Sequence, residues 1–158
     1  MAVHVDLSAP ELQPQDVLDF ILKHTENRPP VNILFKVSRE VVEMYRGAAN
    51  RAVTISQAEA DEISEFLSRS LEADDFFMGG RYQCVNCDRT LTFYDVFQAG
   101  RKEHGDEFMR RILAGDEYHI QVARQDQTLL VPCTSCDSAN TIGYLQGHQY
   151  HGDNYCYA

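Results

Sequence analysis

The sequence has little positive charge and no long apolar run. Its 158 residues include 14 Lys and Arg against 24 Asp and Glu, which gives a formal net charge of -10. A chain this negative repels phosphate backbones and anionic lipid, which argues against whole-molecule binding to nucleic acid or to a membrane. No stretch approaches the roughly 18 apolar residues of a membrane helix, and the N-terminal region lacks a basic segment followed by an apolar one. We therefore expect a cytoplasmic protein that does not contact a membrane.

The sequence also lacks the common catalytic motifs. It contains no Gly-rich phosphate-binding loop, no G-x-S-x-G and no H-E-x-x-H. The segment from Pro132 to Cys136 matches the second half of the zinc-deaminase signature, but no H-x-E precedes it, so the general acid/base of that reaction is missing. These absences favour a non-catalytic protein, although they do not settle whether it is an enzyme.

The acidic residues are concentrated in the first half of the chain. Residues 1–75 contain 14 acidic and seven basic residues, whereas all five cysteines lie in residues 76–158. The residue pattern changes at the same place, from helical periodicity to short alternating segments. We predict a helical acidic unit over 1–75 and a cysteine-rich α+β module over 76–158, either as two units or as one compact domain.

Three helices are predicted in the first half. Pro14 is suited to a first helical turn, and the apolar residues that follow it share one helix face. The segment from Val31 to Val37 reads equally as a short strand or as the front of a helix, and we expect a helix from about Ser38. Ser56 and Glu59 have capping-box spacing, so a third helix should begin there.

The strongest signal is a pair of C-x2-C motifs, Cys84 with Cys87 and Cys133 with Cys136, separated by 45 residues. In a reducing compartment these cysteines are unlikely to form disulfides. A C-x2-C turn directs both sulfurs toward one point, and two such turns complete a tetrahedron around a metal. We predict that all four cysteines bind Zn²⁺, and the ligand set alone leaves iron open.

At these two knuckles the sequence resembles zinc-ribbon and rubredoxin-like proteins. The resemblance implies a closed structural site with each knuckle set in a small β-hairpin. Such knuckles commonly have Gly after the second cysteine, whereas this chain has Asp88 and Asp137, which tolerate the left-handed conformation that is wanted there. The gap of 45 residues also exceeds the simple spacing of roughly 15–20, so a further segment must be inserted between the knuckles.

The insertion is predicted to contain strands at 91–97, 118–123 and 128–131, with the last two joined by a polar turn into a hairpin. A short helix, with Phe108 and Met109 on its apolar side, should begin at Gly105. The predicted fold class is therefore α+β: a helical N-terminal unit, then a zinc-ribbon-like β-rich module with an inserted short helix and β-hairpin.

The C-terminal tail holds the other chemically active residues, His148, His151, Asp153 and Cys156. They can be a second metal site, the acid, base and nucleophile of a small active site, or a loop that covers the zinc module. Cys156 or a histidine can also replace a knuckle ligand. His104 and His119 read most simply as exposed residues.

Three functions follow, in order of preference. The first is a non-catalytic zinc protein that binds another protein. The second is a small enzyme in which zinc is a scaffold and the tail residues, with His119, line a pocket between the halves. The third is nucleic-acid binding through the basic residues between Arg101 and Arg111, although Glu103, Asp106 and Glu107 interrupt this run.

Overall fold

The computed structural model describes residues 2–27, 32–48, 53–78, 81–113, 118–122, 129–142 and 146–150. Residues 1–75 contain β1 (Ala2–Asp6), α1 (Pro14–Asn27), β2 (Asn32–Val37), α2 (Arg39–Ala48), β3 (Val53–Thr54), α3 (Gln57–Leu67) and the 3₁₀ turn η1 (Ala73–Asp75). The rest contains β4 (Phe77–Met78), β5 (Tyr82–Gln83), β6 (Thr90–Leu91), α4 (Phe93–His104), α5 (Asp106–Leu113), β7 (Tyr118–Val122), β8 (Leu129–Pro132), β9 (Ala139–Ile142) and β10 (Gln146–Tyr150). The predicted α+β class is confirmed.

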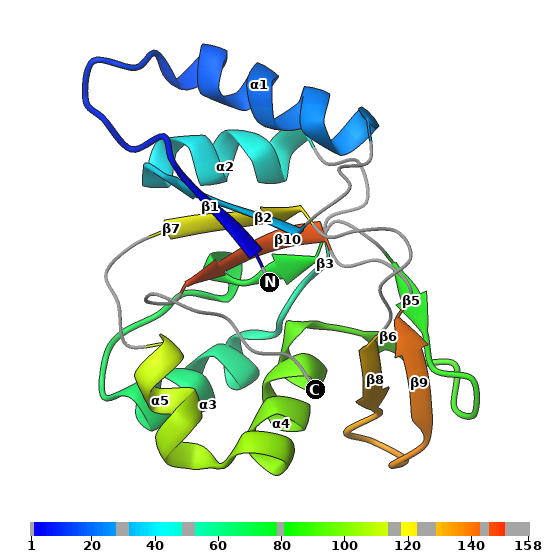
Figure 1. The fold of residues 1–158 in the computed structure, drawn as a ribbon. Coiled ribbons are helices and arrows are strands. Elements are labelled where there is room, and N and C mark those ends of the chain that lie inside the picture. Colours follow the sequence, from blue (N-terminus) through cyan, green and yellow to red (C-terminus); the bar gives the residue numbers. More distant parts are fainter. Residues whose placement is uncertain are drawn as a thin grey trace.

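A six-stranded sheet forms the centre of the molecule, with the order β1-β2-β7-β10-β4-β3. β1 and β2 run parallel, whereas the other neighbours are antiparallel. Three of these strands come from residues 1–75 and three from the later residues, so the sheet crosses the boundary predicted before Phe76. Two separate hairpins, β5-β6 and β8-β9, carry the knuckles beside this sheet (Figure 1).

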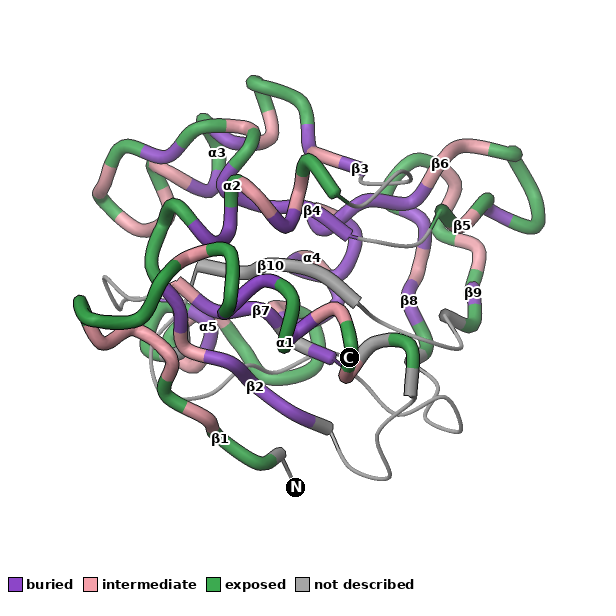
Figure 2. The backbone as a smooth tube through the Cα atoms, turned by 90° about the horizontal axis from the view of Figure 1, so that it is seen from above, coloured by how far each residue is buried: buried purple, intermediate pink, exposed green. Residues whose placement is uncertain are grey.

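Helices α1 and α2 cover one face of the sheet, and α3, α4 and α5 cover the other (Figure 1). The first layer buries Val17 and Ile21 of α1 against Phe35 of β2 and Ile120 of β7. Figure 2 shows buried residues along β2, β7 and β4, where the sheet lies between the two layers. His119 is only 4% exposed, so the prediction that it faces solvent is wrong. The prediction assumed a sheet with one open face, whereas β7 is covered on both.

The helix starts follow the local sequence. α1 begins at Pro14, α2 at Arg39 and α3 at Gln57, with the Ser56–Glu59 capping box formed as predicted. The ambiguous segment before α2 is strand β2. Because β1, β2 and β3 also lie in this half, the helical pattern predicted for residues 1–75 was incomplete.

Two predictions within the insertion are wrong. Residues 93–104 form helix α4, although the strand was predicted to extend from 91 to 97. β7 and β8 are present close to their predicted bounds, but β7 pairs with β2 and β10, whereas β8 pairs with β9. The predicted helix after Gly105 is confirmed as α5.

Over the described ranges, no helix is both long and apolar enough to span a membrane.

Candidate metal centre

The two knuckles have matching backbone geometry. In the first, the N–H of Cys84 donates to the carbonyl of Arg89 at 2.8 Å, and the N–H of Asp88 donates to the carbonyl of Cys84 at 3.0 Å. The second repeats both bonds, from Cys133 to Ser138 at 2.9 Å and from Asp137 to Cys133 at 2.8 Å. Each aspartate has a φ of 61°, the left-handed conformation predicted for it. Each turn therefore folds its two cysteines toward the same side.

The four sulfur atoms meet between the hairpins. All four Sγ atoms lie within 4.8 Å of one another. Across the knuckles, Cys84 and Cys136 are 3.5 Å apart, and Cys87 and Cys133 are 3.7 Å apart. A tetrahedral metal with bonds of about 2.3 Å to sulfur requires sulfurs about 3.8 Å apart. The four cysteines are therefore positioned to bind a metal ion, and all four coordination positions would be filled by protein.

The charges at this cluster also suit a cation. Hydrogen bonds from the side chain and backbone of Ser138 lower the pKa of Cys136 to about 5. The backbone N–H of Arg89 lowers the pKa of Cys87, but desolvation and the three neighbouring thiols outweigh it and raise that pKa to about 11. Four sulfurs this close cannot all ionise without compensation. A divalent ion bound here would supply that compensation and would favour deprotonation of the thiols.

Asn140 of β9 connects the second hairpin to the first knuckle. Its side chain is buried, and its Oδ1 accepts from the N–H of Val85 at 2.9 Å. Its Nδ2 donates to the carbonyl of Ser138 at 2.8 Å and lies 3.7 Å from Sγ of Cys84. The side-chain amide of Asn140 therefore uses both its acceptor and its donors, and one of the donors faces the sulfur of Cys84.

A second connection runs through Asp95, in the first turn of α4. Its side chain is completely buried. Oδ1 accepts from the N–H and the hydroxyl of Thr134, at 3.0 and 2.9 Å, and also pairs with Arg89. Oδ2 accepts from the N–H of Thr92 at 2.8 Å, which completes the N-terminal capping box of α4. One carboxylate thus contacts residues from both knuckles.

Asp95 and Asn140 were not predicted from the sequence. The signal for Asp95 is present, because Thr92 and Asp95 have the same capping-box spacing as Ser56 and Glu59. Asn140 carries no comparable local signal, since its partner Val85 lies 55 residues earlier. Only the assembled knuckles give this asparagine its role.

The tail prediction cannot be followed in the structure. His151, Asp153 and Cys156 lie outside the described residues. His148 lies in β10, in register with Ile120 of β7 and Phe77 of β4. The four cysteines of the knuckles form the only cluster of three or more metal-ligating residues in the part of the chain that the structure describes.

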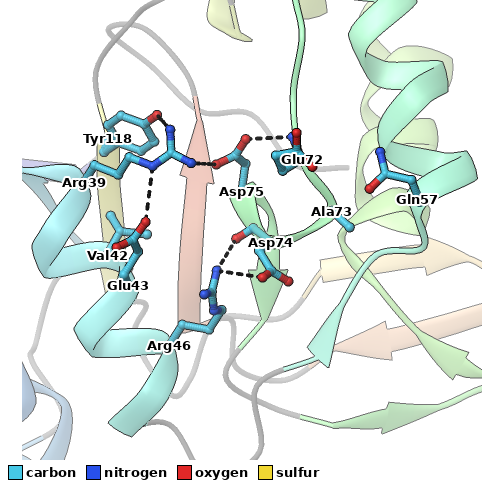
Figure 3. Close-up of a pocket in the computed structure, with 10 residues that line it drawn as sticks. All are labelled: Arg39, Val42, Glu43, Arg46, Gln57, Glu72, Ala73, Asp74, Asp75 and Tyr118. Carbon is cyan, nitrogen blue, oxygen red and sulfur yellow. Dashed lines mark hydrogen bonds and ion pairs between the residues drawn. The ribbon is translucent and has the colours of Figure 1, made fainter.

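A cleft of about 320 Å³ lies elsewhere, between α2, η1 and β7 (Figure 3). Two arginines of α2 cross it. Arg39 approaches Asp75 at 3.8 Å and Glu43 at 3.3 Å, while Arg46 contacts the carboxylate of Asp74 at 3.4 Å. Its described lining includes neither His nor Cys. The charged groups of the cleft pair with each other, which joins α2 to η1.

The basic segment between Arg101 and Arg111 also forms internal contacts. Arg101 donates to both carboxylate oxygens of Asp106, at 2.8 and 3.0 Å. The guanidinium groups of Arg101 and Arg110 lie over the ring of Phe66, 4.8 and 4.5 Å from its centroid. Arg111 lies in the same way over Phe108 at 5.0 Å. These aromatic rings pack under arginines of the same protein.

Residues 28–156 match the family described as a domain of unknown function, DUF8243. The chain therefore belongs to this family. The matched region begins after α1 and includes both knuckles. No curated protein and no solved structure matches the chain.

Proposed function

We propose that the four cysteines form a structural zinc site that holds the two knuckles together as a scaffold. The observation that carries this proposal is the convergence of four sulfurs within 4.8 Å. A four-thiolate site has no open position for water or substrate, so its metal supports the fold and does not act as a Lewis acid. Cysteines that are not paired as disulfides are typical of reducing compartments, which supports a cytoplasmic location.

Elemental analysis of purified protein tests this proposal. We expect the wild-type protein to contain one zinc per chain. A variant in which Cys84 and Cys133 are both replaced by serine should contain none. Cys156→Ser, the matched control, should keep full occupancy. Iron in place of zinc would overturn the choice of metal, and full occupancy in the double variant would overturn the site. Loss of metal from the control would show that the tail supplies a ligand.

We further propose that this scaffold presents a surface to another protein. Two apolar side chains on the knuckle hairpins support this: Val85 at the first knuckle is 80% exposed, and Leu130 of β8 is 59% exposed. Covering these apolar side chains with a partner protein would remove their surface from water and would favour binding. The acidic first half of the chain favours a partner that carries basic groups.

A photo-crosslinking amino acid at position 85 tests the surface in cells. It should give a discrete cross-linked product that disappears when a chelator opens the knuckles. The same probe at Lys23, an exposed position on α1, is the control and should not give this product. Identical products from both positions, or a product at position 85 that survives metal removal, would contradict the proposal.

A further inference from the structure

We propose that Asp95 is a positioning residue of the metal site, and that its carboxylate holds the two knuckles in register so that the four sulfurs converge. This inference rests on the proposed metal site. It concerns how that site is assembled, because Asp95 is not itself a ligand. Its side chain is completely buried, and its two oxygens face Arg89 and Thr92 just before α4 and Thr134 in the second knuckle.

The segments joined by this carboxylate include both knuckles. Thr134 lies between the two cysteines of the second knuckle and directly follows Cys133, so the bond from its N–H fixes the backbone next to a ligand. Arg89 closes the first knuckle, because its carbonyl accepts the N–H of Cys84. Arg89 also donates to the hydroxyl of Thr134 at 2.9 Å. The three side chains form one continuous link between the two turns.

This link matters because each knuckle hairpin is weak alone. β5-β6 and β8-β9 are separate two-stranded sheets, and such hairpins are marginally stable in water. Their cysteine pairs are separated by 45 residues, so the chain between them does not fix their relative position. A buried carboxylate at the start of α4 ties both turns to a helix that packs in the core through Phe93 and Phe97.

Asp95→Asn keeps the shape of the side chain but removes its charge and one acceptor. The new amide NH₂ must then face either the N–H of Thr92 or the donors of Thr134 and Arg89, all of which donate. Residues that position ligands in this way typically change metal affinity by about 10–100-fold when they are replaced. We therefore expect the metal dissociation constant of Asp95→Asn to increase by about that factor.

Asp95 also caps α4, and two further variants separate the roles. Thr134→Val removes a donor of the knuckle link and leaves the cap intact, and it should weaken metal binding about fivefold. Thr92→Ala removes the cap hydroxyl and leaves the link intact, so it should bind metal like wild type. Asp106→Asn is the matched control, since Asp106 also pairs with an arginine but lies on α5, away from the cysteines.

The test is a competition between protein and a chromophoric chelator for Zn²⁺, with Co²⁺ absorption to report the four-sulfur geometry and circular dichroism to report folding. Asp95→Asn and Thr134→Val should lose affinity while Thr92→Ala and Asp106→Asn keep it. Wild-type affinity in a folded Asp95→Asn, or loss in Thr92→Ala with none in Thr134→Val, would overturn the inference. If wild type itself binds no metal, the proposed site fails first.

Discussion

Replacement of Asn140 by aspartate is a sharp test of the electrostatics at the four sulfurs. The two side chains have the same shape, and Oδ1 of either can accept the N–H of Val85. In the variant, however, an anionic oxygen replaces the Nδ2 that lies 3.7 Å from Sγ of Cys84 and 2.8 Å from the carbonyl of Ser138. A favourable donor contact thus becomes repulsion between a carboxylate and a thiolate.

The repulsion should outweigh the lost hydrogen bonds. Two unit charges at this separation interact by about 4 kcal/mol at an effective dielectric constant of about 20. Because the thiolate charge is shared with the metal, we expect about 2–4 kcal/mol, which corresponds to roughly a 30- to 700-fold increase in the dissociation constant for Zn²⁺. Asn140→Ala loses the hydrogen bonds without adding a charge, so it should weaken Zn²⁺ binding by about 1–3 kcal/mol, less than Asn140→Asp does.

Zinc competition titrations of both variants measure this difference. Gln83→Glu is the control, because it makes the same amide-to-carboxylate change at an exposed side chain on β5, in the other knuckle hairpin. It should bind zinc like wild type. If Asn140→Asp binds zinc as tightly as wild type, or no more weakly than Asn140→Ala, the electrostatic reasoning is wrong.

Three further predictions concern the fold. After chelation of the metal, the N–H groups of Cys84 and Cys133 should exchange hydrogen earlier than those of β2 and β7, as measured by mass spectrometry. Simultaneous exchange in both regions would refute this. Phe97→Ala should lower the unfolding free energy by about 3–5 kcal/mol in urea titrations, because the ring is fully buried; a loss below 1 kcal/mol would contradict the packing. Hydrogen bonds from Arg101 lower the pKa of Asp106, so their stabilisation is present above the ordinary value of 3.8 and is lost as pH falls through the lower folded value. Asp106→Asn should therefore show a smaller loss of stability on acidification, and an unchanged acid profile would count against this pair.

The features that could be predicted are those that the local sequence determines. A C-x2-C turn needs only its own residues, and Asp88 and Asp137 adopt the left-handed conformation expected of them. The start of α3 depends on Ser56 and Glu59, which lie three residues apart. In both cases the atoms that stabilise the element come from the same few residues, so reading along the chain is enough.

Helix α4 shows how a local signal can be misread. Residues 91–97 alternate well enough to resemble a strand, but Phe93, Val96 and Phe97 have helical spacing, and all three are buried. A window of seven residues is too short to separate the two periods. The capping pair Thr92 and Asp95 is the additional evidence that favours a helix. This pair could have predicted the cap on α4, but the bonds from Thr134 to Asp95 span 39 residues and carry no local signal.

The pairing of β7 could not be predicted in this way, because its neighbours lie far away in sequence. Leu34 and Phe35 of β2 are in register with Gln121 and Ile120, more than 80 residues later. Strand alternation identifies the two faces of β7 but does not reveal that helices cover both. His119 was therefore assigned to solvent, whereas it is only 4% exposed.

The two cores of the protein differ in their dependence on the metal. The core beneath α3, α4 and α5 includes Cys84 and Cys133, and it also includes Leu91 and Val131 from the knuckle hairpins. The core beneath α1 and α2 contains no knuckle residue among its described members. If the proposed metal holds the knuckles together, its loss should loosen the first core and leave the second in place. The candidate metal site is thus built into one core of the domain, and we expect metal binding and fold stability to be coupled in this core.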